Sequence, residues 1–539
     1  MSDLPTRPTR PAPRQLLARI LDEPGLVEAV RALEPRALGR LIDRVGLEDA
    51  GELVALATTP QLERIFDEDL WRGARPGEEE RFDAERFVMW LEVMLEAGDA
   101  FAARKLAALP EELVMLALER QIMVIDVDAL AVQMAERGDD DVMVEKALDS
   151  CLQQEFGQYR VMSRRHDGWD AVLAVLVALD ENHGDLFQRL MERCCHATTE
   201  WIDDNGGLYR VLTSTEMIEE DAAADREARR ARQGYVAPSS AASFLALART
   251  TALAEIVRAT APDPITRAWM REWERKPAVA AAPPSSTTSS SVPGREQGAR
   301  RLLELIEESE GPATARPAGL LGEGTAPSSG LLRGAMAALG ERDPDVHARR
   351  VEELGFLVNT LVAGASHEGR ALRPVEVIEM AVAACNLGLD HLASSRPGAA
   401  TRTAAEEVLR ETGADKLFRV GFRLLAHEVA LPAARALAGR LAPFAAASAS
   451  VRAVERSLQA AIAAHKPWTA RRRLTALAGT LAPDEIAIAA RLIDECPSLA
   501  PTDGGPAGDD RVGFIATVAE LERARAAVAT LANAGGSPP

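Results

Sequence analysis

The stretch that decides the fold is residues 34–57, which read EPRALGRLIDRVGLEDAGELVALA. After Pro35, apolar residues recur at the i, i+3, i+4, i+7 spacing that places side chains on one face of a helix, at Leu38, Leu41, Ile42 and Val45. Proline is favoured at a first helical position because its missing N–H would have no helical partner there. Gly46 ends the helix, and the same spacing resumes over residues 47–57. We therefore predict two consecutive short helices.

The same pattern covers residues 26–121 as a whole. A third helix starts at Thr59-Pro60, and longer ones are predicted over residues 82–97, 101–109 and 111–122. Helices this short are marginal in isolation, because nucleation is unfavourable and few hydrogen bonds offset it. They must be stabilised by packing on their neighbours, so the sequence predicts a short-helix stack or solenoid-like array.

Composition supports an all-α fold for the whole chain. Hydrophobic residues make up 47% of the 539 residues, but aromatic residues only 4%. Much of the apolar content is alanine and leucine, whereas strands favour β-branched and aromatic residues. The length is sufficient for several hydrophobic cores.

Changes in composition predict two multi-helix domains joined by a disordered linker. Residues 1–13 are expected to form a disordered basic leader, and residues 14–276 an N-terminal helical domain. Residues 277–330 are rich in Ala, Pro, Ser and Gly, which is typical of a flexible linker, with a short charged helix within it at 295–310. A C-terminal helical domain is predicted over 331–533, followed by a tail at 534–539. Within these domains, residues 169–179 are expected to form a buried helix, a helix over 375–387 to end at Gly388, and another helix to begin at Pro432.

Charge, hydropathy and cysteine content exclude several classes of protein. The formal net charge is -20, which disfavours binding to the phosphate backbone of nucleic acids. No apolar run approaches the roughly 18 residues that a membrane-spanning helix needs. The five cysteines are scattered and odd in number, which fits reduced thiols better than a disulfide framework. We expect a cytoplasmic protein.

One predicted helix, residues 213–234, carries a cluster of arginines in its second half: Arg226, Arg229, Arg230 and Arg232. The first three share a face, where guanidinium groups can hold a carboxylate or phosphate bidentately. The cluster is therefore our candidate site for an anion or an acidic protein partner. The alternative is that the arginines pair with Asp221, Asp225 and Glu227, or remain solvated at an ordinary helix end.

No catalytic residue, metal ligand or cofactor is predicted from sequence motifs. The Cys194-Cys195-His196 run lacks the spaced ligand pairs that zinc requires. His427-Glu428 begins a zincin-like motif, but Leu431 stands where the second histidine is needed. An enzymatic or metal-dependent site would have to be assembled from dispersed residues: Asp126, His166, His183 and His196.

The chain resembles an uncharacterised family of large all-helical bacterial proteins, catalogued as a domain of unknown function. The resemblance is carried by residues 62–71 (LERIFDEDLW), 90–98 (WLEVMLEAG), 225–235 (DREARRARQGY), 356–359 (FLVN) and 513–517 (GFIAT). It implies a helical fold and no particular activity. Residues 26–70 are also loosely similar to the short-helix superhelix of magnesium-transporter cytosolic domains and of flagellar motor-switch proteins.

These observations favour a non-catalytic helical scaffold that binds protein partners. The binding surface is expected in a groove between helices or on the arginine-bearing helix. The alternative is an enzyme or metal-dependent regulator with a site built from the dispersed Asp and His residues. An enzyme is the less favoured interpretation, because the chain has no recognisable catalytic constellation.

Overall fold

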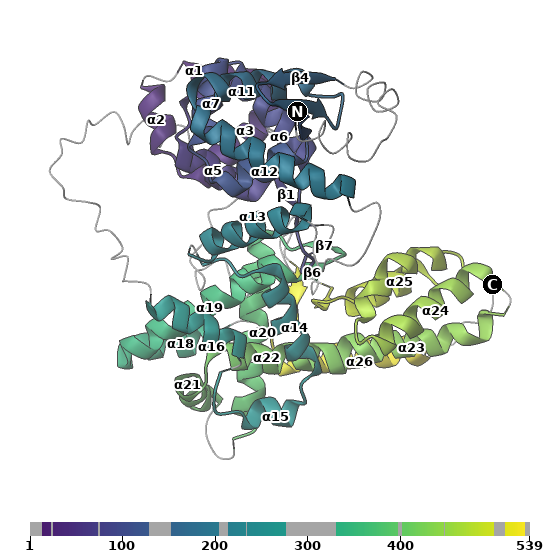
Figure 1. Cartoon of the computed structure of the whole chain (residues 1–539). Coiled ribbons are helices and arrows are strands. Elements are labelled where there is room, and N and C mark those ends of the chain that lie inside the picture. Colours follow the sequence, from purple (N-terminus) through teal and green to yellow (C-terminus); the bar gives the residue numbers. More distant parts are fainter. Residues whose placement is uncertain are drawn as a thin grey trace, which may run out of the picture. The chain divides into compact units, whose positions relative to one another are not determined.

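The computed structural model describes residues 13–22, 25–73, 76–128, 152–203, 214–232, 234–262, 264–275, 330–396, 401–446, 448–500 and 512–533. They form two compact units (Figure 1). The first contains the described residues up to Arg72 and those of Glu80–Arg230, and the second contains Gly73–Glu79 and the described residues from Ala231 onward. Both units consist mainly of helices, which confirms the all-α prediction. The predicted leader, linker, 295–310 helix and tail lie outside the described residues, apart from Pro13 and Gly330.

The first unit begins with the predicted series of short helices. Its helices are α1 (Pro13–Leu21), α2 (Leu26–Ala32), α3 (Pro35–Val45), α4 (Gly51–Leu56), α5 (Thr59–Asp69), α6 (Ala84–Leu95), α7 (Asp99–Ala107), α8 (Glu111–Glu119), α11 (Trp169–Asn182), α12 (Gly184–Asp203) and α13 (Ser214–Ala231). The predicted helix over 47–57 is instead a 3₁₀ turn, η1 (Leu47–Asp49), followed by α4.

Local hydrogen bonds explain how these short helices begin. Pro35 is the first residue of α3, as predicted. Thr58 caps α5, because its hydroxyl accepts from the Gln61 N–H while the Gln61 side chain accepts from the Thr58 N–H. The amide of Gln61 also donates to the carbonyls of Val30 and Leu33 at 2.9 and 2.8 Å. The buried Gln61 side chain therefore provides hydrogen-bond partners both for backbone carbonyls at the end of α2 and for the backbone N–H group at the start of α5.

The core of the first unit is closed by tertiary packing between these helices. The Phe66 and Trp90 rings meet edge to face, with centroids 5.0 Å apart. Val175 and Leu176 of α11 are fully buried, which confirms the prediction that residues 169–179 form a buried helix. Burying each such side chain stabilises the fold by about 1.5–3 kcal/mol, so the short helices are held mainly by this packing.

A small antiparallel sheet interrupts the helices of the first unit, and the sequence analysis did not predict it. Its strands are β3 (Ile122–Asp126), β4 (Gln153–Phe156) and β5 (Tyr159–Ser163), in the order β3-β5-β4. The prediction of a helix over 111–122 was therefore wrong at its end, because α8 stops at Glu119 and Ile122 begins a strand. A two-residue pair, β1 (Trp71–Arg72) and β2 (Arg81–Phe82), lies between α5 and α6.

The second unit is a larger helical array. Its helices are α14 (Pro238–Thr250), α15 (Leu253–Arg258), α16 (Pro264–Arg275), α18 (Gly330–Arg342), α19 (Pro344–Gly364), α20 (Pro374–Ser394), α21 (Thr401–Glu411), α22 (Ala414–Leu424), α23 (Leu431–Leu441), α24 (Ala449–Ala463), α25 (Pro483–Leu492) and α26 (Val518–Asn533). Residues 442–444 (η5) and 467–477 (η6) form 3₁₀ turns. Two short strand pairs complete it: β6 (Ser366–His367) with β7 (Arg370–Ala371), and β8 (Ser498–Leu499) with β9 (Gly513–Phe514).

Two glycines allow α20 and α22 to cross in close contact. A Cβ atom added to Gly388 would lie 2.0 Å from the carbonyl oxygen of Leu417, and one added to Gly421 would lie 2.0 Å from that of Ala384. The sequence analysis placed Gly388 at the end of a helix over 375–387, and this was wrong, because α20 continues to Ser394. The glycine is required by the neighbouring backbone and not by a turn.

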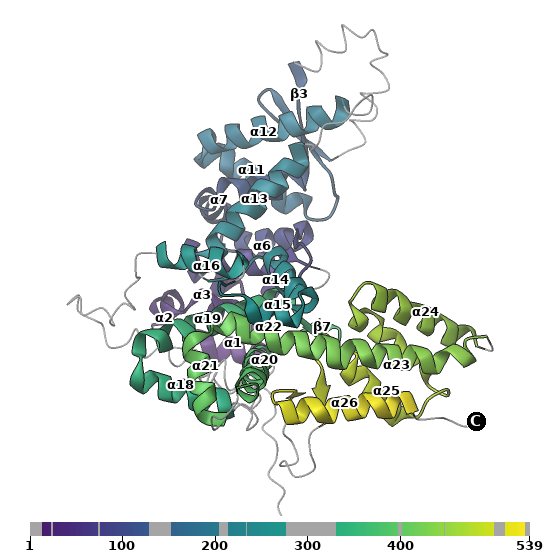
Figure 2. The ribbon, with the colours of Figure 1, turned by 90° about the horizontal axis from the view of Figure 1, so that it is seen from below.

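A π-helical turn joins α22 to α23. The turn, η4 (Leu425–Ala430), makes Ala414–Leu441 one continuous helical run, which Figure 2 shows as a single long ribbon. The sequence predicted that Pro432 begins a new helix. Pro432 instead lies inside the run, where its missing N–H removes one helical hydrogen bond. The wider π turn immediately before it accommodates that loss.

The division between the units differs from the predicted boundary at residue 276. It falls after Arg230, and α14 and α15 belong to the second unit. The physical reason is the apolar face of α14: the Phe244 ring packs on Phe356 of α19 and Phe418 of α22, with centroids 5.6 and 5.9 Å apart. Burying this face requires residues that lie more than a hundred positions later in the chain.

Within the described residues, no helix combines the length and the apolarity needed to cross a membrane.

Candidate functional site

The predicted arginine cluster on α13 is engaged by carboxylates of its own unit. Arg229 forms a bidentate pair with Asp67 of α5, with N–O distances of 3.0 and 2.6 Å. Arg226 donates to the backbone carbonyl of Asp67 at 2.6 Å and pairs with Glu80 at 2.6 Å. Arg230 also pairs with Glu80, at 2.9 Å. The bidentate position that an external anion would need on Arg229 is filled by Asp67.

Burial and electrostatics show that this cluster holds α13 against the unit. Arg226 is only 4% exposed, and its guanidinium lies over the Trp71 ring, 4.9 Å from the centroid. Burial and the neighbouring charge of Arg230 lower the pKa of Arg226 to about 10. The carboxylates that lie nearest to these guanidinium groups are those of Asp67 and Glu80. They are not the predicted alternative partners, Asp221, Asp225 and Glu227. The fourth member, Arg232, is exposed and follows the last residue of α13.

The dispersed residues of the alternative interpretation lie on separate elements. Asp126 ends β3, His166 lies in the turn before α11, and His183 caps the end of α11. His196 is exposed on α12, whereas Cys194 of the same helix is buried, which raises its thiol pKa to about 12. Across the described residues, no group of three or more His, Cys, Asp or Glu side chains is arranged to hold a metal ion.

A groove lies between α3 and α5 in the first unit. Its volume is about 140 Å³. Its walls come from α3, α5 and one residue of α6, and the lining residues are Pro35, Arg36, Gly39, Arg40, Ile42, Asp43, Arg64, Ile65, Glu68, Asp69 and Trp90. We call it the α3–α5 groove. It combines an apolar base with charged ends, which is the usual character of a binding site.

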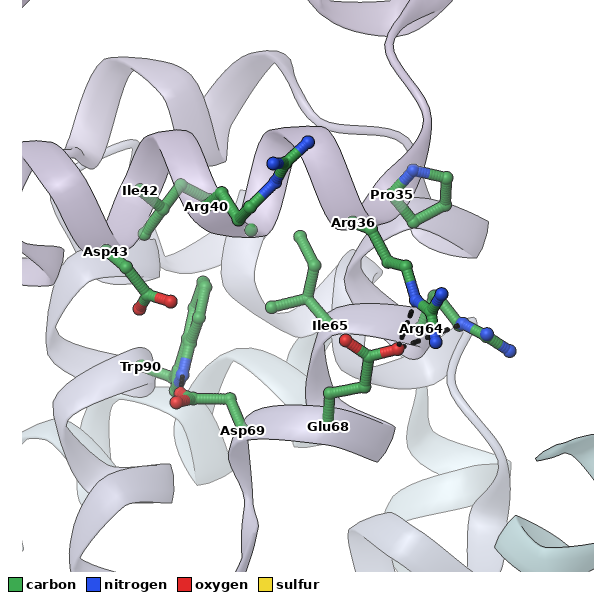
Figure 3. Close-up of a pocket in the computed structure, with 11 residues that line it drawn as sticks. Pro35, Arg36, Arg40, Ile42, Asp43, Arg64, Ile65, Glu68, Asp69 and Trp90 are labelled. Carbon is green, nitrogen blue, oxygen red and sulfur yellow. Dashed lines mark hydrogen bonds and ion pairs between the residues drawn. The ribbon is translucent and has the colours of Figure 1, made fainter. Parts of the chain in front are cut away.

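The two ends of the α3–α5 groove differ in charge (Figure 3). At one end Glu68 lies between Arg36 and Arg64, at 3.1 and 3.7 Å. At the other end the carboxylate of Asp69 accepts hydrogen bonds from the Trp90 indole at 2.6 Å and from Arg86 at 2.7 Å. The Asp69 end is thus fixed by short hydrogen bonds. At the arginine end, Arg36 is 57% exposed but Arg64 only 13%.

Asp43 also lies at the Asp69 end of the groove, as Figure 3 shows. Reduced hydration and the nearby charge of Asp69 raise the pKa of Asp43, and Arg86 opposes this shift. Its side chain remains 68% exposed, so solvent screens these interactions. Asp43 therefore lies at the solvent-exposed rim of the groove and is not a buried acid.

Gly39 leaves the middle of this groove open. It lies within α3, and a Cβ atom there would meet Ile65 Cγ1 at 3.5 Å, an ordinary van der Waals contact. Neither a positive φ nor a steric conflict requires glycine at this position. Glycine in a helix interior costs about 0.5–1 kcal/mol relative to alanine. Because Gly39 has no side chain, it leaves space above Ile65 that a larger residue would fill, and this space is kept at that cost in helix stability.

A second, much smaller cavity lies beside the π turn of the second unit. It is about 10 Å³ in volume and is lined by Arg249, Ala426, His427, Leu431, His465, Pro467 and Trp468. His465 has φ 55°, at the position after α24 where glycine is usual. Burial and the adjacent charges, first that of Arg423, lower the pKa of His427 to about 4. The space admits no more than a water molecule.

A buried polar network near this cavity anchors the β6–β7 hairpin. Asp494 accepts from the Glu368 backbone N–H at 2.9 Å, pairs with Arg471 at 3.1 Å and contacts His367 Nδ1 at 3.2 Å. The adjacent Glu495 forms a 2.5 Å pair with Arg249, whose guanidinium lies over the Trp468 ring. Both carboxylates are satisfied by groups of the chain itself, which fits a structural role.

The sequence analysis did not single out the α3–α5 groove. It predicted both helices and a binding surface between helices, but it named none of the polar lining residues as a site. A signal was present in the sequence: Gly39 interrupts an otherwise favourable helix, and Arg36 and Arg40 flank it at i−3 and i+1. The contribution of Arg64 from α5 depends on tertiary packing, which sequence spacing does not show.

Residues 9–464 match a family of unknown function, DUF6178. Neither the curated proteins nor the solved structures give a significant match.

Proposed function

Since this chain belongs to the DUF6178 family of unknown function, we propose its role from its own geometry: a non-catalytic helical protein that binds protein partners through the α3–α5 groove. The observation that carries the proposal is Gly39. A helix-interior glycine without a backbone requirement maintains a cavity of about 140 Å³ at the cost of helix stability. Such a cavity can accept one side chain of a partner as an anchor.

Two further observations support a binding role over a catalytic one. The arginines of α13 are used to hold their own unit together, so they contribute affinity for a partner at most through the exposed Arg232. The groove holds carboxylates and arginines, but none of the histidines of the described residues is among its lining residues. Its chemistry is that of recognition by charge and shape.

The cytoplasm is the compartment we propose. Cys194, Cys195, Cys385 and Cys496 are present as free thiols. Burial raises the pKa of Cys385 and Cys496 well above the ordinary value, so these thiols are poor nucleophiles. This pattern fits a reducing compartment.

The test is capture of partners by the tagged full-length protein from native lysate, read by mass spectrometry. The wild-type chain and a Gly39→Leu variant, which fills the groove, are compared at equal folded concentration. The matched control is Gly439→Leu, which adds the same side chain to an exposed helix position with no heavy atom within 4 Å of its Cβ. We expect one reproducible partner with wild type and the control, and at least tenfold less with Gly39→Leu. Folded wild-type bait that retains no reproducible partner would overturn the proposal.

A further inference from the structure

The second unit contains a basic segment within an acidic chain. Residues 414–477, which run from α22 to η6, hold eleven Lys and Arg side chains against three Asp and Glu, a local net charge of +8. The whole chain carries a formal net charge of -20, so the residues outside this segment carry -28. Within the segment α24 packs on α23, and η6 packs on α24. The positive excess is therefore concentrated in one part of the fold.

Carboxylates of the unit neutralise part of this excess. Arg440 of α23 pairs with Glu485 at 2.9 Å, and Arg471 of η6 pairs with Asp494 at 3.1 Å. Side chains held in this way have a structural role, as the α13 arginines do, and offer little charge to a ligand. The candidates for a binding surface are the basic side chains of this segment that no carboxylate engages.

Five such side chains lie around the π turn η4, and we call them the π-turn basic cluster: Arg423, His427, Arg435, His465 and Lys466. His427 and His465 line the same small cavity. Burial first, and then the charges of Arg423, His465 and Arg435, lower the pKa of His427 to about 4, so these groups lie near one another. Lys466 directly follows His465. In the part of the chain that the structure describes, none of the five pairs with a carboxylate.

The cluster is accessible, and the acids beside it are already engaged. Its exposed members are Arg435, His465 and Lys466. Glu428, which follows His427 in the chain, pairs with Arg525. Glu495 pairs with Arg249, which lines the same cavity, at 2.5 Å. The described part of the unit therefore leaves the positive charge of the cluster without a counterion of its own.

We propose that the π-turn basic cluster is a docking surface for an acidic segment of a partner protein. This surface is separate from the α3–α5 groove, which belongs to the first unit. Guanidinium and ammonium groups form charge-assisted hydrogen bonds with carboxylates, so Arg435 and Lys466 can each hold an Asp or Glu side chain. A carboxylate bound here also offsets the charges that disfavour protonation of His427. Charge complementarity is thus the basis of recognition.

A protein segment fits this surface better than a nucleic acid does. The rest of the chain carries -28, and solvent charges are screened only beyond about 8–10 Å at ordinary salt. A short acidic segment meets the cluster alone, whereas the phosphate backbone of a longer polyanion extends to the acidic residues around it. Single-stranded nucleic acids also use aromatic rings on which bases stack. The ring in the adjacent cavity, Trp468, already has the Arg249 guanidinium over it, 4.6 Å from its centroid.

The experiment measures fluorescence anisotropy of two labelled peptides with the full-length chain at low and high salt. The peptides are identical except that one carries glutamates where the other carries glutamines. We expect the glutamate peptide to bind about tenfold more tightly than the glutamine peptide, and its affinity to fall as salt increases. The double variant Arg435→Gln with Lys466→Gln should weaken it about tenfold, which corresponds to about 1.4 kcal/mol.

The matched control is Arg349→Gln with Arg410→Gln. These two arginines are exposed on α19 and α21, at the end of the unit away from α23 and α24 (Figure 1). The same net charge is therefore lost outside the cluster, and the control should bind the glutamate peptide as wild type does. Both double variants replace exposed side chains, and circular dichroism checks that each is folded.

No binding of the glutamate peptide, equal binding of the two peptides, or insensitivity to the cluster substitutions would overturn the inference. An equal loss of affinity in the cluster variant and the control would do the same, because it would show an effect of net charge alone. A single-stranded oligonucleotide that bound as tightly as the glutamate peptide, with the same sensitivity to the cluster substitutions, would show a nucleic-acid surface instead and would also overturn it. Capture that depends on Gly39 tests the first unit, so the proposed function stands or falls separately.

Discussion

Replacing Gly388 or Gly421 by alanine is the most direct test of how the second unit is packed. Each added Cβ atom would lie 2.0 Å from a backbone carbonyl oxygen of the opposite helix. A relaxed contact between these atoms needs more than 3 Å, so α20 and α22 must separate by about 1 Å or more. Neither obstacle is a side chain that can rotate away. Because this crossing lies in the main core of the unit, the separation opens gaps around it.

We expect each substitution to lower the free energy of unfolding by about 3 kcal/mol or more, at the upper end of the cost of overpacking. For a unit of this size, that corresponds to a fall in melting temperature of roughly 6–12 °C. The assay is urea unfolding followed by circular dichroism, with calorimetry as a second measure. Gly439→Ala is the matched control, because its Cβ meets no heavy atom within 4 Å. Alanine there should stabilise the helix by about 0.5–1 kcal/mol.

The double variant, Gly388→Ala with Gly421→Ala, tests whether the two glycines act at the same contact. A Cβ on Gly388 would also lie 3.2 Å from the backbone N of Gly421, so the two sites share one interface. Once either alanine has separated the helices, the second requires little further movement. The double variant should therefore cost clearly less than the sum of the single variants. Single variants within about 0.5 kcal/mol of wild type, or strict additivity, would refute the reasoning.

The remaining predictions concern charged and titratable groups. Asp67→Ala removes the buried carboxylate that pairs bidentately with the partly buried Arg229, so we expect the free energy of unfolding in urea to fall by about 3 kcal/mol. Glu68→Ala removes an exposed carboxylate that pairs with Arg36 and, at a longer distance, with Arg64, and should change the free energy of unfolding by less than about 1 kcal/mol; equal effects of the two substitutions would contradict this account. Burial alone would raise the pKa of Glu376, but hydrogen bonds from two arginines outweigh it and lower the pKa to about 2. The stabilisation from Glu376 is present above its ordinary pKa of 4.5 and is lost as the pH falls toward 2, so Glu376→Gln should flatten the stability curve in that range. The pKa of His427 is lowered from 6.5 to about 4, so between these values the unfolded chain binds more protons than the folded chain. Stability should fall as the pH is lowered through that window, and His427→Gln should remove this part of the slope; an unchanged slope would show that other groups cause it.

Periodicity and proline placement predicted the short helices well because both act locally. Pro35 and the apolar spacing after it depend only on neighbours within one or two turns. The strands were missed for the same reason. Residues 122–126 continue an apolar run that begins in α8, and only pairing with residues 159–163 makes them a strand. Short apolar segments do not reveal their partner.

Gly388 shows where local signals become ambiguous. A glycine that follows an apolar helical run is typical of a helix end, and the sequence analysis interpreted it so. The same residue is equally typical of a close crossing between helices. The two cases differ only in what lies opposite, here the backbone of Leu417, nearly thirty residues later. Sequence spacing contains no information about that neighbour.

The arginines of α13 show that local signals are ambiguous for function as well as for fold. Their spacing correctly indicated a shared face, but it suggested partners within the same helix. The carboxylates that engage them belong to α5 and to the residues before β2, about 150 positions earlier in the chain. A cluster of charge in one helix is thus ambiguous until the opposing surface is known. The α3–α5 groove is the opposite example. Its arginines are more widely spaced in the sequence than those of α13, but the fold brings them together beside an apolar cavity. Binding sites are therefore better sought where a cavity and charged side chains coincide than where charge is dense in the sequence.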